Sequence, residues 1–250
     1  MNEQRVERER QFHDHAFEHG VRAPVSKFYA VAQASDRQYQ RQLDRIPDGS
    51  AVLEYGCGEV SQAIRMANRC DVTAIDISPV GVEHARDEAK RLGLTSAKFA
   101  VMDAENLTFT DASFDGVCGS GILHHLDLPR AFGEVARVLK PDGVGIFTEP
   151  LGHNPLINAY RNRTPQYRTP DEHPLLMRDL ALARRYFSAV ECEYFSLSTL
   201  AAVPLRSTRV FTPVLRAGEI FDQALFKVIP PARRLAWTVV IRCRGVRPRR

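Results

Sequence analysis

The chain has 250 residues, a formal net charge of +4, and 44% hydrophobic residues. This length suits one α/β domain with an added cap, and the composition is that of an ordinary globular protein. Arginines in the last ten residues carry much of the positive charge, so the charge does not indicate a nucleic-acid partner. The five cysteines show no disulfide or metal spacing, which predicts reduced thiols in a cytoplasmic protein. The sequence has no apolar run of the length that a signal peptide or a membrane span needs.

The first 46 residues predict two helices. Residues 1–20 are strongly charged and carry three histidines, with Phe12 and Phe17 as the large apolar residues of their second half. We predict a solvated helix that these two aromatic rings pin to the protein. Residues 27–46 place apolar side chains at helical spacing, and the turn residues 47–49 then end that helix.

Residues 51–58 combine a buried strand with a tight glycine turn. The apolar run ends near Tyr55, and Gly56 and Gly58 then flank Cys57. Glycine permits positive φ and lets a ligand approach the backbone closely. Residues 60–68 predict a helix, and a strand, a glycine turn and a helix form the cradle that α/β folds use for nucleotide-like ligands. Cys57 is expected to fill the turn as an unreactive residue.

Three later apolar runs lead to a carboxylate. Asp76 lies twenty residues after Gly56, where an acid can accept hydrogen bonds from the hydroxyls of an adenosine ribose. Asp103 follows the run 97–102, and Glu149 follows the run 144–148. Because carboxylates repel phosphate, Asp76 and Asp103 favour a ligand without phosphate groups.

The run 114–119 leads into Ser120 and the histidine pair His124-His125. Adjacent side chains on a helical turn point about 100° apart, so we expect one histidine to face the site. The pair does not have metal-ligand spacing, and we predict no metal site. His124 is either a general base or a structural histidine bonded to the backbone. His153 is the alternative base.

These features together resemble the class I S-adenosylmethionine-dependent methyltransferases, in particular the small-molecule branch of the ubiquinone and menaquinone methyltransferases. The resemblance covers residues 46–150 and includes the phrase Arg137-Val138-Leu139-Lys140-Pro141-Asp142-Gly143 before the fifth strand. It implies an α/β, doubly wound, seven-stranded and mostly parallel sheet, with N-terminal helices and a lid insertion after strand five. It also implies S-adenosylmethionine as the cofactor. In such enzymes an N-terminal helix often folds over the cofactor and the substrate, which is the alternative to a solvated helix at residues 1–20.

The resemblance assigns roles to several residues. It places Glu54 near the amino group of the cofactor's methionine part, although a structural acid that caps a neighbouring backbone is the alternative. It implies that Asp76 binds the ribose, Ile77 packs on the adenine, and Asp103 accepts from the adenine amino group. The implied cofactor-binding set is Glu54, Gly56, Cys57, Gly58, Asp76, Ile77, Asp103, Ala104 and Ser120.

Two further expectations follow from the family pattern. A histidine at the place of His124 and an acid at the end of strand five act together in related enzymes, so Glu149 is the expected partner of His124. The third glycine that the family often has is Val60 here. The loop is therefore expected to lie less close to the methionine end of the cofactor.

Beyond Leu151 the family pattern fades. Residues 154–174 predict a substrate lid, because an insertion after strand five overhangs the carboxyl ends of the strands. Residues 175–187 predict a helix, and 189–195 and 235–243 predict two strands that the family pairs antiparallel at a sheet edge. Residues 196–234 predict a helical subdomain on the core or a dimer partner, with an apolar pocket or a membrane-surface contact as the alternatives.

The sequence therefore predicts a single methyltransferase domain over residues 1–250. Its parts are an N-terminal helical cap (1–46), a cofactor-binding core (47–150), a lid and helix (151–187), and a terminal strand pair (188–250) with the helical insertion 196–234.

The predicted activity is methyl transfer to a hydroxyl of a small, lipophilic metabolite in specialised metabolism. Transfer to nitrogen or carbon, and a scaffold without turnover, are the alternatives. A nicotinamide dehydrogenase is disfavoured, because Ser61 stands where its fingerprint requires glycine. The predicted partner is a small-molecule substrate. The sequence leaves open whether the protein is a monomer or a homodimer and whether it contacts a membrane surface.

Overall fold

A computed structural model describes residues 2–19, 26–58 and 61–248. Within this part of the chain, seven strands form one sheet in the order β3-β2-β1-β4-β5-β7-β6. Neighbouring strands are parallel except at β7, which runs antiparallel to both β5 and β6. The predicted doubly wound, seven-stranded, mostly parallel sheet is confirmed. The strands are β1 Ala51–Tyr55, β2 Asp71–Asp76, β3 Lys98–Val101, β4 Phe114–Ser120, β5 Leu139–Pro150, β6 Phe187–Phe195 and β7 Thr238–Val246.

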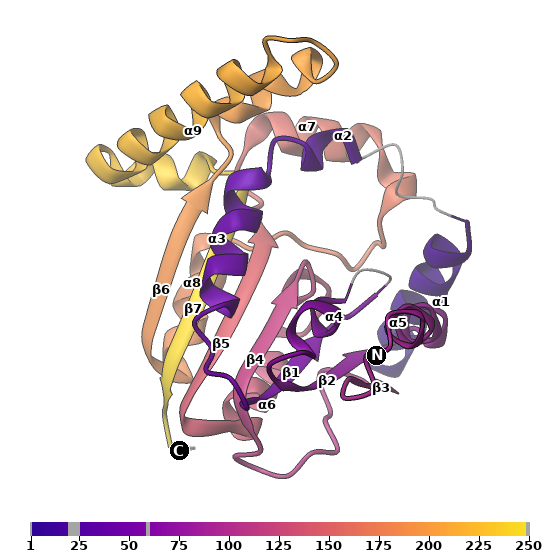
Figure 1. Cartoon of the computed structure of the whole chain (residues 1–250). Helices are drawn as coiled ribbons and strands as arrows, with labels where there is room; N and C mark the ends of the chain where they lie inside the picture. The colour runs from indigo at the N-terminus through magenta and orange to yellow at the C-terminus, as the bar shows by residue number, and fades with distance from the viewer. Residues whose placement is uncertain (1, 20–25, 59–60, 249–250) are drawn as a thin grey trace.

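Helices surround this sheet (Figure 1). The α-helices are α1 Asn2–His19, α2 Ser26–Tyr29, α3 Gln33–Leu43, α4 Gln62–Met66, α5 Pro79–Arg91, α6 Leu128–Val138, α7 Pro155–Arg163, α8 Met177–Leu182 and α9 Phe211–Val228. Short 3-10 helices are η2 Leu123–His125, η3 Pro165–Tyr167, η4 Ala183–Arg185, η5 Ser198–Leu205 and η6 Pro230–Leu235. Helix starts follow local chemistry, as at α5, where the Ser78 side chain accepts from the Gly81 N–H and Pro79 occupies the first turn.

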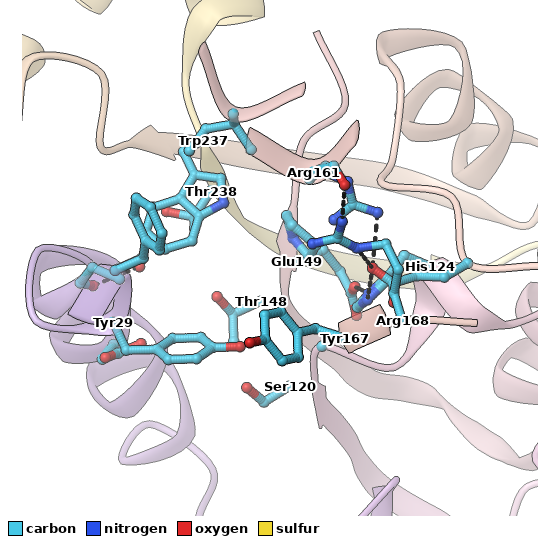
Figure 2. A pocket seen from close by; sticks show the side chains of 18 of the residues that line it. Tyr29, Ser120, His124, Thr148, Glu149, Arg161, Tyr167, Arg168, Trp237 and Thr238 are labelled. Atoms are coloured by element: carbon cyan, nitrogen blue, oxygen red, sulfur yellow. Dashed lines mark hydrogen bonds and ion pairs between the residues drawn. The ribbon is translucent and has the colours of Figure 1, made fainter. Parts of the chain in front are cut away.

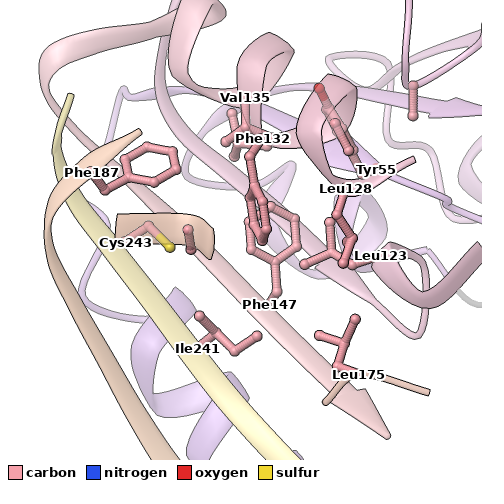
Figure 3. Packing of buried hydrophobic residues seen from close by; sticks show 14 of the residues in the cluster. Tyr55, Leu123, Leu128, Phe132, Val135, Phe147, Leu175, Phe187, Ile241 and Cys243 are labelled. Atoms are coloured by element: carbon pink, nitrogen blue, oxygen red, sulfur yellow. The ribbon is translucent and has the colours of Figure 1, made fainter. Parts of the chain in front are cut away.

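The sheet is buried on both faces. Successive side chains of a strand point to opposite faces, so Leu53 and Tyr55 of β1 join one apolar cluster while Val52 joins the other. The first cluster packs against α6 and α8 and includes Phe132 and Phe147 (Figure 3). The second packs against α3, α4 and α5. The central strands are therefore rigid supports for the residues at their carboxyl ends.

The helix predicted over residues 27–46 is divided into α2 and α3. Val31, in the break between them, is fully buried and packs with Ala202 and Leu215 of the segment after β6. Burial of Val31 against a distant part of the chain outweighs the local helical pattern. The predicted helix 60–68 is observed as α4; Val60, whose effect on the glycine loop was predicted, lies outside the described residues.

The last two strands form the antiparallel pair at one edge of the sheet. Between them, η5, α9 and η6 form a helical arm beyond the end of β6 (Figure 1). No helix among the described residues has the length and apolarity that a bilayer crossing requires.

Candidate active site

The parallel strands place the predicted site residues along one edge of the sheet. Gly56 follows β1, Asp76 ends β2, and Ser120 ends β4. Ser120 pairs in register with Thr148, next to Glu149 in β5. In an open α/β sheet, ligands bind beyond this edge, because loops from several strands converge there.

His124 and Glu149 form a buried pair. Nδ1 of His124 lies 2.7 Å from Oε2 of Glu149, and both side chains are almost inaccessible to water. The other oxygen of Glu149 accepts from the backbone N–H groups of Ile122 and Leu123, at 2.9 and 2.8 Å. Glu149 therefore fixes both the turn that carries His124 and the orientation of its ring. The structure brings together the two residues that were expected to act as a pair.

His124 lines the larger of the two cavities at this edge of the sheet (Figure 2). The cavity measures about 240 Å³, close to the lower end of the range of about 300–1,000 Å³ for small-molecule sites. Tyr29 and Tyr167 point toward each other inside it (Figure 2). Aromatic side chains from three distant segments form its walls: Phe28, Tyr29, Tyr160, Tyr167 and Trp237. These residues come from α2, the 154–174 insertion and the residue before β7.

A second carboxylate, Glu172, faces the other side of the His124 ring. Its Oε1 lies 3.8 Å from Nε2 of His124, too far for a hydrogen bond, and accepts from Arg161 at 2.8 Å. Burial opposes ionisation of Glu172. The nearby histidines and Arg161 outweigh this effect and hold its pKa below the usual range. His124 Nε2 thus faces a polar part of the cavity wall, formed by Glu172 and Arg161.

The alternative base His153 lies elsewhere. It lines neither of these two cavities, and its Nε2 accepts a hydrogen bond of 3.1 Å from the backbone N–H of Met177. This bond ties the chain after β5 to the start of α8. Of the two candidate bases, only His124 lines a cavity at this edge of the sheet.

The glycine turn after β1 has the expected backbone. Gly56 and Gly58 both have positive φ, +67° and +46°. A Cβ on Gly56 would lie 3.0 Å from the Ile122 side chain, so the close packing at this turn requires glycine. The Cys57 side chain is buried in an apolar cluster, and burial raises its pKa far above the usual range. Cys57 thus fills the turn with its side chain turned into the core.

Glu54, in β1, is bonded to the start of α4. Its two oxygens accept from the hydroxyl of Ser61 and from the backbone N–H groups of Gln62 and Ala63, at 2.5, 2.7 and 2.9 Å. These bonds are those of a structural acid that caps α4, which was the alternative interpretation of Glu54. Burial outweighs the three donors and raises the pKa of Glu54.

Asp76 and Asp103 line a second, smaller cavity of about 40 Å³ together with Gly56, Ile77 and Ala104. Asp76 accepts from the N–H groups of Gly58 and Ser78, at 2.8 and 2.9 Å, and thereby ties the glycine turn to β2. Burial outweighs these bonds and raises the pKa of Asp76. Carboxylates beside apolar side chains suit the hydroxyl groups and the ring of an adenosine.

Helix α1 covers this smaller cavity. Val6, Glu9 and His13 form its outer wall, and the ring of Phe17 packs against Gly58 and Gly81. Figure 1 shows α1 beside α5 at the β3 side of the sheet. One face of α1 is therefore buried against the smaller cavity, which agrees with the alternative of a helix folded over the site and not with a solvated helix.

Polar contacts hold α1 in place. Arg5 forms an ion pair with Glu105 and donates to the backbone oxygen of His125 at 2.6 Å. Arg8 donates to Asp171 at 2.7 Å. Glu9 accepts from Thr169. These partners lie in the loop after β3, in η2 and in the 154–174 insertion, so α1 joins three segments that are distant in sequence.

The contact also leaves buried polar atoms without hydrogen-bond partners. Both ring nitrogens of His125 and one oxygen of Glu9 are in this state, although that oxygen lies 3.1 Å from His125 Nδ1. Glu9, His13 and His125 approach closely enough to share an ion, and so do His124, His125 and Glu172. The absence of a metal stays a prediction.

Comparison with known proteins identifies the family. A family model for a methyltransferase domain matches residues 53–147. Aklanonic acid methyltransferase from Streptomyces sp. (strain C5) is 34% identical over 161 residues, which are 57% of this chain and 69% of that protein. This chain belongs to the class I S-adenosylmethionine-dependent methyltransferases.

A second member of this methyltransferase family is 27-O-demethylrifamycin SV methyltransferase from Amycolatopsis mediterranei (strain S699), which is 38% identical over 119 residues, 45% of this chain and 44% of that protein. The chain spans about half the length of the curated relatives it matches, from 44% to 69%. Phosphoethanolamine N-methyltransferase 2 from Haemonchus contortus, solved with S-adenosyl-L-methionine, shares the fold. Its TM-score is 0.61 at 19% identity, over 85% of this chain and 53% of that one. S-adenosylmethionine is the family's methyl donor.

Sequence reasoning missed several residues of this site. The set on α1, namely Arg5, Glu9 and His13, lies in a stretch that was expected either to be solvated or to fold over the site, but none of these residues was predicted to line a cavity. Trp237 and Phe28 were read as parts of a strand and a helix, and they line the larger cavity instead. Their aromatic character was the available signal, but nothing local showed that they meet.

Proposed function

We propose that this methyltransferase transfers a methyl group to a hydroxyl of a small, lipophilic, aromatic metabolite, with His124 as the general base. The observation that carries the proposal is the bond of 2.7 Å between His124 and Glu149 at the edge of the aromatic cavity. A general base must lie within hydrogen-bond reach of the proton that it removes. Of the two adjacent histidines, only His124 lines that cavity.

Glu149 determines which nitrogen of His124 acts. An ionised carboxylate can only accept hydrogen bonds, so the bonded Nδ1 carries the proton and Nε2 has the free electron pair. A substrate hydroxyl at Nε2 gives up its proton to that nitrogen while its oxygen attacks the methyl group. The positive charge that His124 then carries is stabilised by Glu149 and by Glu172 on the other side of the ring.

The residues of the smaller cavity fit the cofactor in their chemistry. Asp76 and Asp103 would accept from its hydroxyl and amino groups, Ile77 and Ala104 would contact its ring, and Gly56 allows close approach. Bound S-adenosylmethionine supplies a methyl group already activated on a sulfonium. Glu54 acts on this site as a positioning residue, since it holds the start of α4 after the glycine turn.

The walls of the larger cavity support the substrate class. Phe28 lies 4.6 Å from Tyr160 and 6.0 Å from Trp237, between ring centroids, so the apolar surface is continuous. Aromatic walls of this kind favour flat, apolar substrates. The name of the rifamycin relative places its methyl group on an oxygen. It supports oxygen as the acceptor and a role in specialised metabolism.

Calorimetric titration with S-adenosylhomocysteine, with NADH as the control, tests the cofactor. We expect binding of the first ligand only. Transfer of a labelled methyl group to a panel of phenols and matched amines then tests the acceptor. Methylation of phenols that is lost in His124→Ala supports the proposal. Methylation of amines that survives in His124→Ala would identify a nitrogen acceptor, because a neutral amine needs no base. Failure to bind S-adenosylhomocysteine would favour the scaffold alternative.

A further inference from the structure

One face of helix α9 is buried against the rest of the protein. Leu215 and Phe226 are buried on that face. Asp222, also buried, accepts from the backbone N–H groups of Leu197 and Ser198, each at 2.9 Å. These contacts fix the rotation of α9 about its own axis. The side chains that point to water are therefore determined as well.

The opposite face of α9 is apolar and exposed. Phe221 is 56% exposed, Ile220 72% and Val228 77%. Exposed apolar residues recur at alternating spacings of four and three: Val210, Val214, Ala217, Phe221, Ala224 and Val228. At 3.6 residues per turn, these six positions lie within an arc of about 80°. A surface helix of a globular protein normally presents polar residues there. We name these six residues and Ile220 the outer stripe.

All exposed charged residues of the segment that carries the outer stripe are positive. The exposed charged residues within 206–235, a range the structure describes in full, are Arg206, Arg209, Arg216, Lys227 and Arg234. Neither acid in this range offsets these positive charges at the surface, since Asp222 is buried and Glu219 is ion-paired with Arg37 at 2.7 Å. Pairing two copies of α9 would bring no acid opposite these cations. A surface that complements the outer stripe and its cations has an apolar layer covered by anionic groups.

We propose that α9 binds an anionic lipid bilayer, with the outer stripe below the headgroups and the surrounding cations at their level. An interfacial helix of this kind combines an apolar face with arginine and lysine at the headgroup boundary. The site lies on the arm between β6 and β7, just beyond the end of β6 and therefore at the same edge of the sheet as the two cavities (Figure 1). The residues of the outer stripe line neither of these cavities.

Flotation of the full chain with vesicles tests this surface. We expect recovery with phosphatidylcholine vesicles that contain phosphatidylglycerol, no recovery with phosphatidylcholine alone, and loss of binding at high salt, because salt screens the arginines. Ile220→Glu combined with Phe221→Glu should reduce the recovered fraction about tenfold. Arg216→Glu combined with Lys227→Glu should do the same at low salt.

Leu92→Glu is the matched control, since Leu92 is an exposed apolar residue (47%) at the end of α5, far from the arm in sequence. It should bind vesicles like the parent protein. Equal recovery of the parent and the Ile220/Phe221 variant would overturn the proposal, and so would equal binding to neutral vesicles. A parent dimer in light scattering that the Ile220/Phe221 variant dissociates, without vesicle binding, would assign the outer stripe to a second copy. Thermal melting checks that each variant is folded.

Discussion

The two cavities at the carboxyl edge of the sheet are neighbours with different walls. The larger has aromatic walls from α2, the 154–174 insertion and the start of β7, and its volume is about 240 Å³. The smaller lies between the strand ends and α1, and its volume is about 40 Å³. Small-molecule sites commonly measure about 300–1,000 Å³. If the smaller cavity takes a ligand of adenosine size, as proposed, α1 must move outward, whereas the larger cavity needs much less change.

The contacts of α1 lower the free-energy cost of such a movement. An unpartnered buried polar group costs about 1–3 kcal/mol, and the contact of α1 buries such atoms on Glu9 and on His125. Polar contacts hold α1 in place but leave these groups unsatisfied. A ligand that replaces α1 at His125 can supply the missing partners. The larger cavity is thus enclosed by α2 and the 154–174 insertion, and the smaller one by α1, whose contact leaves buried polar atoms without partners.

The largest effect is expected from His124→Ala, which tests the larger cavity alone. Loss of the base should reduce turnover with a hydroxyl substrate about 100-fold to 10,000-fold. Affinity for S-adenosylhomocysteine should stay unchanged, because His124 does not line the smaller cavity. Steady-state rates and calorimetry measure the two quantities.

His153→Ala is the matched control for this variant, since its ring lines neither of the two cavities described. It should lower thermal stability slightly and leave turnover nearly intact. A loss of turnover in His153→Ala as large as in His124→Ala would contradict the assignment of His124 as the base.

Asp76→Asn tests the smaller cavity. Removing the charge weakens the hydrogen bonds that a ribose would donate, and bonds to charged groups contribute about 1.5–3 kcal/mol, so affinity for S-adenosylhomocysteine should fall about tenfold to a hundredfold. Asp71→Asn, at the exposed start of the same strand, is the control and should bind like the parent. Unchanged affinity in Asp76→Asn would show that the ribose lies elsewhere.

Acidification should release α1. Burial, helped by the charge of His124, lowers the pKa of His125 from 6.5 to about 3. If lifting α1 exposes His125, docking is fully favoured above pH 6.5 and loses about 1.4 kcal/mol for each pH unit between 6.5 and 3. Glu9 acts in the same direction below about pH 4.5, since the nearby His125 and His13 and the hydrogen bond from Thr169 outweigh burial and lower its pKa.

Hydrogen exchange of the α1 amides at pH 7 and pH 5, corrected for intrinsic rates, measures this release. Protection of α1 should fall about 30-fold, the equivalent of about 2 kcal/mol. Helix α9, which contains no histidine, serves as the internal reference. Equal loss of protection in both helices would indicate global loosening in place of release of α1.

Arg5→Ala should have the smallest effect. It removes the ion pair with Glu105 and the bond to the backbone of His125, so α1 should dock less tightly. We expect S-adenosylhomocysteine to associate about threefold to tenfold faster in stopped-flow measurements. Arg10→Ala on the same helix, whose partners Glu7 and Asp14 lie within α1, should change this rate little. Slower association in Arg5→Ala would mean that Arg5 holds the cofactor and does not hold α1.

Much of the fold was predictable because its signals are local. The glycine turn at 56–58 and the acids at the strand ends follow from backbone freedom and from strand period. The pairing of His124 with Glu149 could also be expected, since parallel strands end at one edge. Less predictable were the break between α2 and α3 and the burial of one face of α1. Both depend on contacts with residues more than a hundred positions away, such as Ala202 for Val31 and His125 for Arg5.

The motifs that carry the resemblance to the family can be read from the sequence, because glycine turns, strand periodicity and their order along the chain are local features. The resemblance then implied the sheet and the site residues. The tertiary structure was needed to show which side chains share a cavity. It assigned Glu54 to the cap of α4, placed His153 away from the two cavities and brought Phe28 to Trp237. It also showed that the outer stripe of α9 is exposed. Burial is a property of the assembled chain, and an apolar helix has the same local pattern whether its second face meets protein or water.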